Sequence, residues 1–281
     1  MRIAVTGASG LVGWPVAQWL AARGHTITAL GRRRVAGLLH RDWQLGDVPD
    51  LSDQDALIHA AFQHVTGRYR GGEGDDPEGF VHANLDGTLA LFEGAAALGL
   101  RTVFLSSRAV YGAYPPGTRL SEGMEPQPDT LYGQVKLAAE RGLPPNGTAL
   151  RATGIYGPPV PGRGHKWQDL FAAFEAGDRP APRIGTEVHA HDVAAAVELV
   201  LGLTAPPTLL NVSDIVLDRR VLLETNTRVS GKAGPLPDPS DPKTVNEMET
   251  AILRGLGWQP QGMTGLAEAL AANLAYDRSA D

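Results

Sequence analysis

The chain has 281 residues, 43% of them hydrophobic and 20% charged, which is ordinary for a globular enzyme with a large core and suggests one large or two unequal domains. Its formal net charge of −6 gives no general attraction to nucleic acid or to an anionic membrane, and no run approaches the ~18 apolar residues that span a bilayer. The chain has no cysteine, which excludes disulfides, thiolate metal ligands and thiol nucleophiles and fits a cytoplasmic protein that acts on a small molecule.

The chain opens with a predicted strand at residues 3–5 and a helix that runs to residue 22, joined by a glycine-rich turn. Glycine lets such a turn close, lets its backbone approach a diphosphate, and lets the helix pack on the strand. Free N–H groups and the positive dipole end at the helix start also favour phosphate. The alternative is an ordinary strand–helix turn. We assign cofactor binding to six residues of this turn: Gly7, Ser9, Gly10, Leu11, Val12 and Gly13.

A basic stretch follows the predicted second strand, residues 26–30. In a fold that binds NAD, an acidic residue near the end of this strand would hold both ribose hydroxyls. Gly31 occupies that place here, and Arg32 and Arg33 follow it; guanidinium groups suit the extra 2′-phosphate of NADP. We therefore expect NADP as the cofactor, with NAD as the alternative. A solvated basic turn would also explain the pattern.

Two more predicted strands, residues 44–48 and 55–61, and a long amphipathic helix, residues 80–98, supply further cofactor contacts. An aspartate in the third strand would reach the adenine, unless it is an ordinary loop residue, and small residues ending the fourth would let the cofactor pass close to the sheet. The residues assigned to these contacts are Asp47, Val48, Ala60, Ala61 and Asn84. His59 is interpreted as a packed structural histidine, and residues 67–79 as a surface loop or a mobile flap.

Strands that alternate with helices imply an α/β fold with a parallel, doubly wound sheet, whose ligands bind beyond the carboxyl ends of its strands. Ser107 lies at such an end, after the predicted fifth strand at residues 101–107. Tyr132 and Lys136 follow in a predicted helix, residues 131–140, and their spacing of four places them on one face. A tyrosine and a lysine at this spacing usually form an ordinary surface pair. We interpret this pair as a candidate site because its helix follows a strand that ends in Ser107.

The rest of the chain is expected to complete the sheet and to add a small C-terminal lobe. The predicted boundaries are residues 1–153, completed by about 189–213, for the dinucleotide-binding domain, and 154–188 with 214–281 for the lobe. The elements predicted here are a strand at 148–151, a helix at 193–201, a strand at 209–212, a loop at 231–242 and helices at 248–253 and 264–274. We predict no metal site, because His189 and His191 lack further ligands and Asp192 is better explained as a helix N-cap.

In their order, these motifs are similar to those of the extended short-chain dehydrogenase/reductases, the NAD(P)-dependent epimerase/dehydratase group, over nearly the whole chain. The main motifs are the glycine turn at residues 6–13, Ser106 to Gly112, Tyr132-Gly133-x-x-Lys136, Leu150-Arg151 with Tyr156-Gly157-Pro158, and Val188-His189-x-x-Asp192. The resemblance implies a Rossmann-type sheet with a small C-terminal substrate-binding lobe. A homodimer is common in the family.

The resemblance also implies a mechanism, with Ser107, Tyr132 and Lys136 as the catalytic residues. Tyr132 would be the general acid/base that exchanges a proton with the substrate oxygen as hydride moves to or from the nicotinamide. Lys136 would favour the phenolate and hydrogen-bond the nicotinamide ribose, so both residues are also assigned to cofactor binding. Ser107 would hold the substrate oxygen in line.

Departures from the family pattern bear on the substrate. Dehydratases of the family usually place an acidic pair directly after the serine, and Arg108 and Ala109 stand there instead, so dehydration is not expected. Nucleotide-sugar epimerases often carry a diphosphate-binding arginine where this chain has Gly185, and residues 231–242 lack a second arginine. A substrate without a diphosphate is therefore consistent with the sequence.

Three functions remain open from the sequence. The first is an oxidoreductase that transfers hydride between NADP(H) and a carbonyl or secondary alcohol. The second is a nucleotide-sugar epimerase, such as one for a UDP-sugar, which returns the hydride to the same substrate. The third is a non-catalytic protein that senses NADP.

Overall fold

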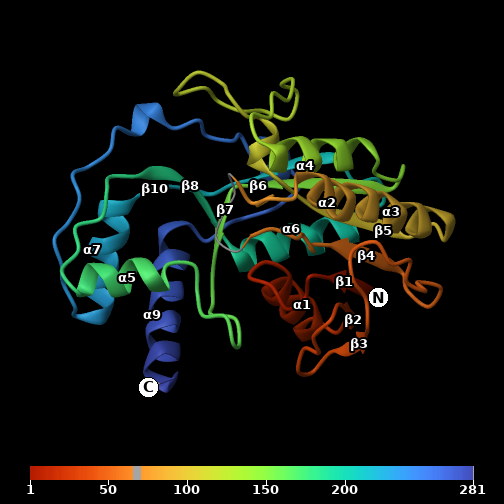
Figure 1. The fold of residues 1–281 in the computed structure, drawn as a ribbon, viewed down its shortest axis with the longest axis horizontal. Helices are drawn as coiled ribbons and strands as arrows, with labels where there is room; N and C mark the ends of the chain where they lie inside the picture. Colours follow the sequence, from red (N-terminus) through yellow and green to blue (C-terminus); the bar gives the residue numbers. More distant parts are fainter. Residues whose placement is uncertain (66–70, 281) are drawn as a thin grey trace.

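The computed structural model describes residues 1–65 and 71–280, and within them the chain folds into the predicted doubly wound α/β sheet (Figure 1). The main sheet of this part of the chain has seven strands, and each neighbouring pair is parallel. In spatial order the strands are β3 (Leu39–Arg41), β2 (Thr26–Leu30), β1 (Arg2–Thr6), β4 (Ala56–His59), β5 (Arg101–Ser107), β6 (Gly147–Ala152) and β9 (Leu209–Val212). The strand order reverses between β1 and β4, so this fold predicts ligand binding beyond their carboxyl ends.

Helices cover both faces of the main sheet (Figure 1). On one face α1 (Gly13–Ala22) packs against α6 (Ala190–Gly202), and their apolar sides share a core with β1, β2 and β4. On the other face lie α2 (Pro77–Val81), α3 (Gly87–Ala97) and α4 (Leu131–Arg141). Two layers of helices therefore bury both sides of the strands, which is why the strands are apolar along most of their length.

A second, smaller sheet lies beside the main one, with the strand order β10 (Ile215–Asp218), β8 (Ile184–His189) and β7 (Gly154–Tyr156). Its helices are α5 (Gln168–Glu175), α7 (Arg219–Ser230) and α9 (Gly262–Ala280), and they enclose a separate aromatic and aliphatic core (Figure 1). The remaining short elements are a 3₁₀ turn at Arg108–Val110, another at Pro242–Thr244, and α8 (Ala251–Gly255). No helix in the described residues combines the length and the apolar character needed to cross a bilayer.

The chain passes between the two sheets through three short connections. One residue separates β6 from β7, none separates β8 from α6, and two separate β9 from β10. In the first connection the Thr153 hydroxyl donates to the Thr186 carbonyl oxygen at 2.6 Å. In the third, the Asp214 backbone N–H donates to the Glu187 carbonyl oxygen at 3.2 Å. Both bonds tie the connections to β8.

Several local predictions are confirmed and several are wrong. β5 has the predicted bounds, and α4 extends the predicted helix by one residue. The third strand lies at Leu39–Arg41 and not at residues 44–48, which form a loop closed by the Asp47 carboxylate, an acceptor for the Gln44 N–H at 3.0 Å. Of the predicted loop at residues 67–79, positions 67–70 lie outside the described residues, and α2 begins at Pro77.

Three helix predictions also need correction. The long helix predicted at residues 80–98 is interrupted by a π-helical turn, His82–Asp86, around the polar residue Asn84. The N-cap of α6 is His189 and not Asp192, because the His189 Nδ1 atom accepts the His191 backbone N–H at 3.2 Å. The helix predicted at residues 248–253 begins only at Ala251, since Met248 forms a β-bridge with Leu120.

The glycine turn after β1 is built on two very close approaches. Gly7 has a φ of +68°, and a Cβ atom there would lie 2.7 Å from the Ala61 backbone nitrogen. A Cβ atom on Gly13 would lie 2.3 Å from the Gly7 carbonyl oxygen, so the start of α1 packs directly on the turn. The sequence thus specifies glycine at both places for steric reasons.

Replacing Gly13 by alanine should destabilise the fold by about 2 kcal/mol or more, because backbone atoms would have to move to accommodate the methyl group. Gly202→Ala at the end of α6 is the matched control, since a Cβ atom there meets nothing within 4 Å and should change stability by no more than ~0.5 kcal/mol. Denaturant unfolding of both variants measures the difference. Equal stabilities would contradict this account of the turn.

Candidate functional site

The predicted catalytic pair lies on the first turns of α4. The Thr130 hydroxyl caps this helix by accepting the Gly133 N–H at 3.1 Å. Lys136 is 3% exposed, and its Nζ atom donates to the Leu105 carbonyl oxygen of β5 at 2.8 Å. The same Nζ atom lies 6.0 Å from the centroid of the Tyr132 ring. The structure therefore brings the two residues together and fixes them against the carboxyl end of β5.

Burial strongly perturbs Lys136. It lowers the pKa of the ammonium from 10.5 to about 7, although the nearby Glu140 carboxylate opposes this shift. Two aromatic rings stabilise the charged form: the Nζ atom lies 4.6 Å from the Phe62 ring centroid and 4.5 Å from that of Phe104. Lys136 can therefore exchange its proton near neutral pH, which is typical of residues at reactive sites.

Ser107 ends β5, two residues after the carbonyl group that holds Lys136. Its hydroxyl oxygen accepts the Ala109 backbone N–H at 3.2 Å and so caps the 3₁₀ turn Arg108–Val110. This turn packs on α4, since a Cβ atom on Gly133 would lie 2.5 Å from the Ala109 carbonyl oxygen. Ser107, Tyr132 and Lys136 thus occupy one end of the sheet.

A buried polar network lies behind these residues, and sequence reasoning did not assign it a role. The Glu140 carboxylate accepts two Arg151 N–H groups, at 3.0 and 2.7 Å, and also the Ser106 hydroxyl. The Arg151 guanidinium lies 4.7 Å from the Tyr111 ring centroid, and the Tyr111 hydroxyl donates to Asn211 Oδ1 at 2.8 Å. The network joins α4 to β5, β6 and β9. Its one sequence signal is Glu140, which lies four residues after Lys136 on the same helical face.

A second buried chain supports the glycine turn. The Thr6 hydroxyl is bonded to His59 Nδ1 at 2.8 Å and accepts the Ala60 and Ala61 N–H groups, both at 3.1 Å. His59 Nε2 is bonded to the Thr88 hydroxyl at 2.9 Å, and that hydroxyl donates to a carbonyl oxygen. Because the Thr88 hydroxyl uses its own proton for that carbonyl oxygen, it must accept a hydrogen bond from the Nε2–H group of His59. The Thr6 hydroxyl must then donate to the unprotonated Nδ1 atom. The imidazole of His59 is therefore neutral. Burial, followed by the charge of Lys136, accordingly lowers the pKa of His59 to about 3.

The other residues assigned to the cofactor lie near the carboxyl ends of β1, β2 and β4. Gly31 follows β2, and the side chains of Arg32 and Arg33 are exposed; within the described residues neither makes a hydrogen bond or ion pair. Val48 is 70% exposed. Asn84 is buried and uses its amide to hold the segment after β4: it accepts the Gln63 N–H at 2.7 Å and donates to the Gln63 carbonyl oxygen at 2.8 Å.

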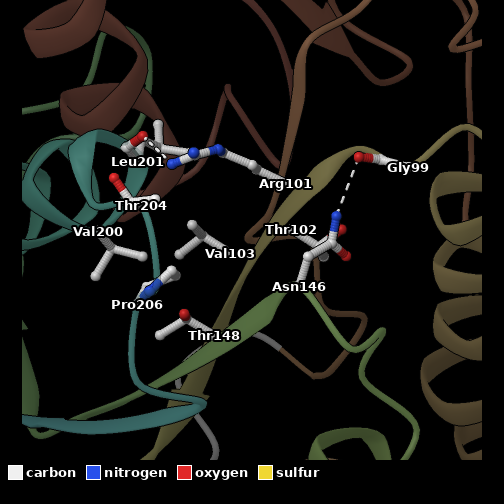
Figure 2. A pocket seen from close by; sticks show the side chains of 10 residues that line it. All are labelled: Gly99, Arg101, Thr102, Val103, Asn146, Thr148, Val200, Leu201, Thr204 and Pro206. Carbon is white, nitrogen blue, oxygen red and sulfur yellow. Dashed lines mark hydrogen bonds between the residues drawn. The ribbon is translucent and has the colours of Figure 1, made fainter.

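A cavity of about 180 Å³ lies at the opposite end of β5 and β6, far from Ser107 (Figure 2). Arg101 projects into it and donates to the carbonyl oxygens of Leu201 and Leu203, at 2.7 and 2.5 Å, so it caps the C-terminal end of α6. Asn146 likewise donates to the Gly99 carbonyl oxygen at 3.0 Å. These polar groups are already paired, and the cavity is a structural feature of the amino-terminal edge of the sheet. The described residues contain no cluster of side chains suited to a metal ion.

Comparison with known proteins identifies the chain's relatives. Residues 3–213 match the model of the NAD dependent epimerase/dehydratase family. A dTDP-6-deoxy-L-talose 4-dehydrogenase (NAD(P)(+)) from Kitasatospora kifunensis is 28% identical over 92% of this chain and 91% of its own length. A dTDP-4-dehydrorhamnose reductase from Mycolicibacterium smegmatis is 26% identical over 76% of this chain, and the match spans only 64% of the reductase. MoeE5, solved in complex with UDP-glucuronic acid and NAD, has the same fold, with a TM-score of 0.79 at 22% identity over 100% of both chains.

The neutral state of His59 should make stability depend on pH. Above pH ~6.5 the imidazole is neutral in both states, and its contribution to stability is complete. Below that pH the unfolded chain binds a proton that the folded chain binds only near pH 3, so stability falls, by about 3 kcal/mol at pH 4. Chemical denaturation at pH 7 and pH 4 measures this loss.

The His59→Gln variant should show a smaller loss between these pH values than the wild type. His82→Gln is the control, because His82 is exposed and lies outside this chain of hydrogen bonds. An unchanged pH dependence in His59→Gln would show that His59 is not the group that titrates.

Proposed function

Because the chain belongs to the NAD dependent epimerase/dehydratase family, an NAD(P)-dependent group of enzymes within the extended short-chain dehydrogenase/reductases, we propose that it catalyses net hydride transfer between NADP(H) and a carbonyl or secondary alcohol. The observation that carries this proposal is the buried Lys136, hydrogen-bonded to β5 one helical turn after Tyr132. The match to a 4-dehydrogenase over 92% of the chain supports a net redox reaction and a sugar-like substrate.

The residues around β1 suit a dinucleotide. The positive φ of Gly7 and the close approach of Gly13 bring the start of α1 directly against the turn after β1, where its backbone N–H groups would face a phosphate. A nicotinamide cofactor bound there supplies or accepts the hydride. The exposed Arg32 and Arg33 would hold the 2′-phosphate of NADP, because that end of β2 carries no carboxylate to bind the ribose hydroxyls.

In the proposed mechanism the protein moves one proton. Tyr132 gives its phenolic proton to the substrate oxygen during reduction and takes it back during oxidation. The charged ammonium of Lys136 lowers the free energy of the Tyr132 phenolate. Because the pKa of Lys136 is about 7, the fraction of Lys136 that is charged falls as the pH rises through neutrality. Ser107 donates a hydrogen bond to the same substrate oxygen and so orients it.

One prediction from this mechanism concerns the phenolic proton of Tyr132. Tyr132→Phe should lower turnover by a factor of about 10² to 10⁴ and leave the affinity for NADPH nearly unchanged, since only the transferable proton is lost. Tyr114→Phe is the control, because its hydroxyl donates to the Glu125 carbonyl oxygen in a surface loop. The assay follows the absorbance of reduced nicotinamide with the sugars named for the two curated relatives.

The same assay separates the alternatives. Net oxidation or reduction of added cofactor supports the proposed reaction, whereas a changed sugar with no net cofactor consumption indicates epimerisation. No turnover of any sugar by the wild type would favour the cofactor-sensing alternative. A Tyr132→Phe protein of normal rate would mean that the acid/base has been misassigned.

A further prediction concerns the preference for NADP(H) over NAD(H). NADP(H) should bind about ten- to a hundredfold more tightly than NAD(H), because a charge-assisted hydrogen bond to the 2′-phosphate contributes roughly 1.5–3 kcal/mol. Arg32→Ala should remove most of this preference, and Arg34→Ala, which deletes a nearby exposed charge, should keep it. Calorimetric titration with both cofactors measures the ratio, and equal affinities in the wild type would exclude NADP specificity.

A further inference from the structure

Arg108, directly after Ser107, is a half-buried cation whose hydrogen bonds are incomplete. Its Nε and Nη2 atoms both lie 3.4 Å from a single acceptor, the carbonyl oxygen of Asn246. A guanidinium has five N–H donors, and the guanidinium of Arg108 makes no other hydrogen bond and no ion pair with the described residues. Burial lowers the pKa of Arg108, and the charge of Asp129 opposes this effect. A buried charge of this kind normally has a close partner.

The surroundings of Arg108 hold it beside the catalytic residues. Its 3₁₀ turn packs on α4, the helix that carries Tyr132. On the other side, the Asn246 side chain accepts the Thr118 N–H at 3.1 Å and donates to the Tyr114 carbonyl oxygen at 3.0 Å, which fixes the backbone opposite the guanidinium. Arg108 is therefore a positioned group within one residue of Ser107, not a mobile surface side chain.

Cations and carboxylates are mixed around this end of the sheet, where the charge of Glu140 acts on Lys136 and that of Asp129 acts on Arg108. His64, in the segment after β4, is close enough to both Lys136 and Arg163 for each to lower its pKa, after the larger effect of burial. Arg163 belongs to the small lobe, so cations from both lobes lie near the catalytic helix.

We propose that Arg108 binds an oxyanion, a carboxylate or a phosphate, carried by the substrate close to the carbon that exchanges hydride. This inference rests on the proposed function of Ser107 and Tyr132. The planar fork of a guanidinium matches two oxygens of either group, and the long bonds to Asn246 are easily exchanged for short charge-assisted ones. Arg108 would then select among sugars by their charge.

The test uses three probes that share one sugar ring and differ at one carbon: glucose, glucuronate and glucose 6-phosphate. Each is titrated by NMR into the NADP-loaded protein, so the readout needs no turnover and remains valid if the assigned reaction is wrong. At least one anionic probe should bind about tenfold or more tightly than glucose. The tighter of the two anions identifies the group as carboxylate or phosphate.

Arg108→Gln should abolish the preference for the anion. Arg119→Gln is the matched control, because Arg119 is exposed and pairs with Glu247 on the surface, and this variant should keep the preference. Arg108→Lys retains the charge without the fork and should keep only part of the preference; it decides the question if the glutamine variant does not fold. Equal binding of the three probes, including no detectable binding of any, or a full preference in either Arg108 variant, would overturn the proposal.

Discussion

The position of one proton, on Nε2 of His59, orders the hydrogen bonds that support the glycine turn after β1. With that proton fixed, the Thr6 hydroxyl donates to Nδ1 and is free to accept the backbone N–H groups of Ala60 and Ala61. Gly7 approaches the peptide group between Ala60 and Ala61 so closely that no side chain would fit there. The turn after β1, the end of β4 and the start of α3 are thus positioned by one neutral imidazole. A charged imidazole would present a donor to Thr6 and break the chain.

The helix α4 depends on a related constraint, in which buried charges are fixed by specific partners. Lys136 and Glu140 lie one turn apart on α4, and they are held by the Leu105 carbonyl group and by Arg151 respectively. Removing charged groups from water is costly, so their arrangement is favourable only where the partners are well aligned. This requirement holds α4 in one register against β5 and β6. The position of Tyr132 then follows from the helix.

The sequence predicted the features that depend on neighbours in the chain. The glycine turn, the bounds of β5 and the shared face of Tyr132 and Lys136 follow from periodicity and local sterics, and the doubly wound sheet is confirmed. The short third strand was misplaced by a few residues, because β3 has only three residues and is defined by its pairing with β2. The strands of the small sheet are also defined by pairing and not by local sequence, since β7, β8 and β10 pair with strands far along the chain. Nothing local could show that Arg108 would be half-buried, because Asn246 lies 138 residues away.

The three connections between the sheets have a mechanical consequence. A hinge needs a few residues whose backbone angles are free to change. Here the links have at most two residues, and the first and third are hydrogen-bonded to β8. Both hydrogen-bonded links are anchored to the same strand, so movement of the small sheet against the main one would have to break these bonds or change the backbone angles within the links.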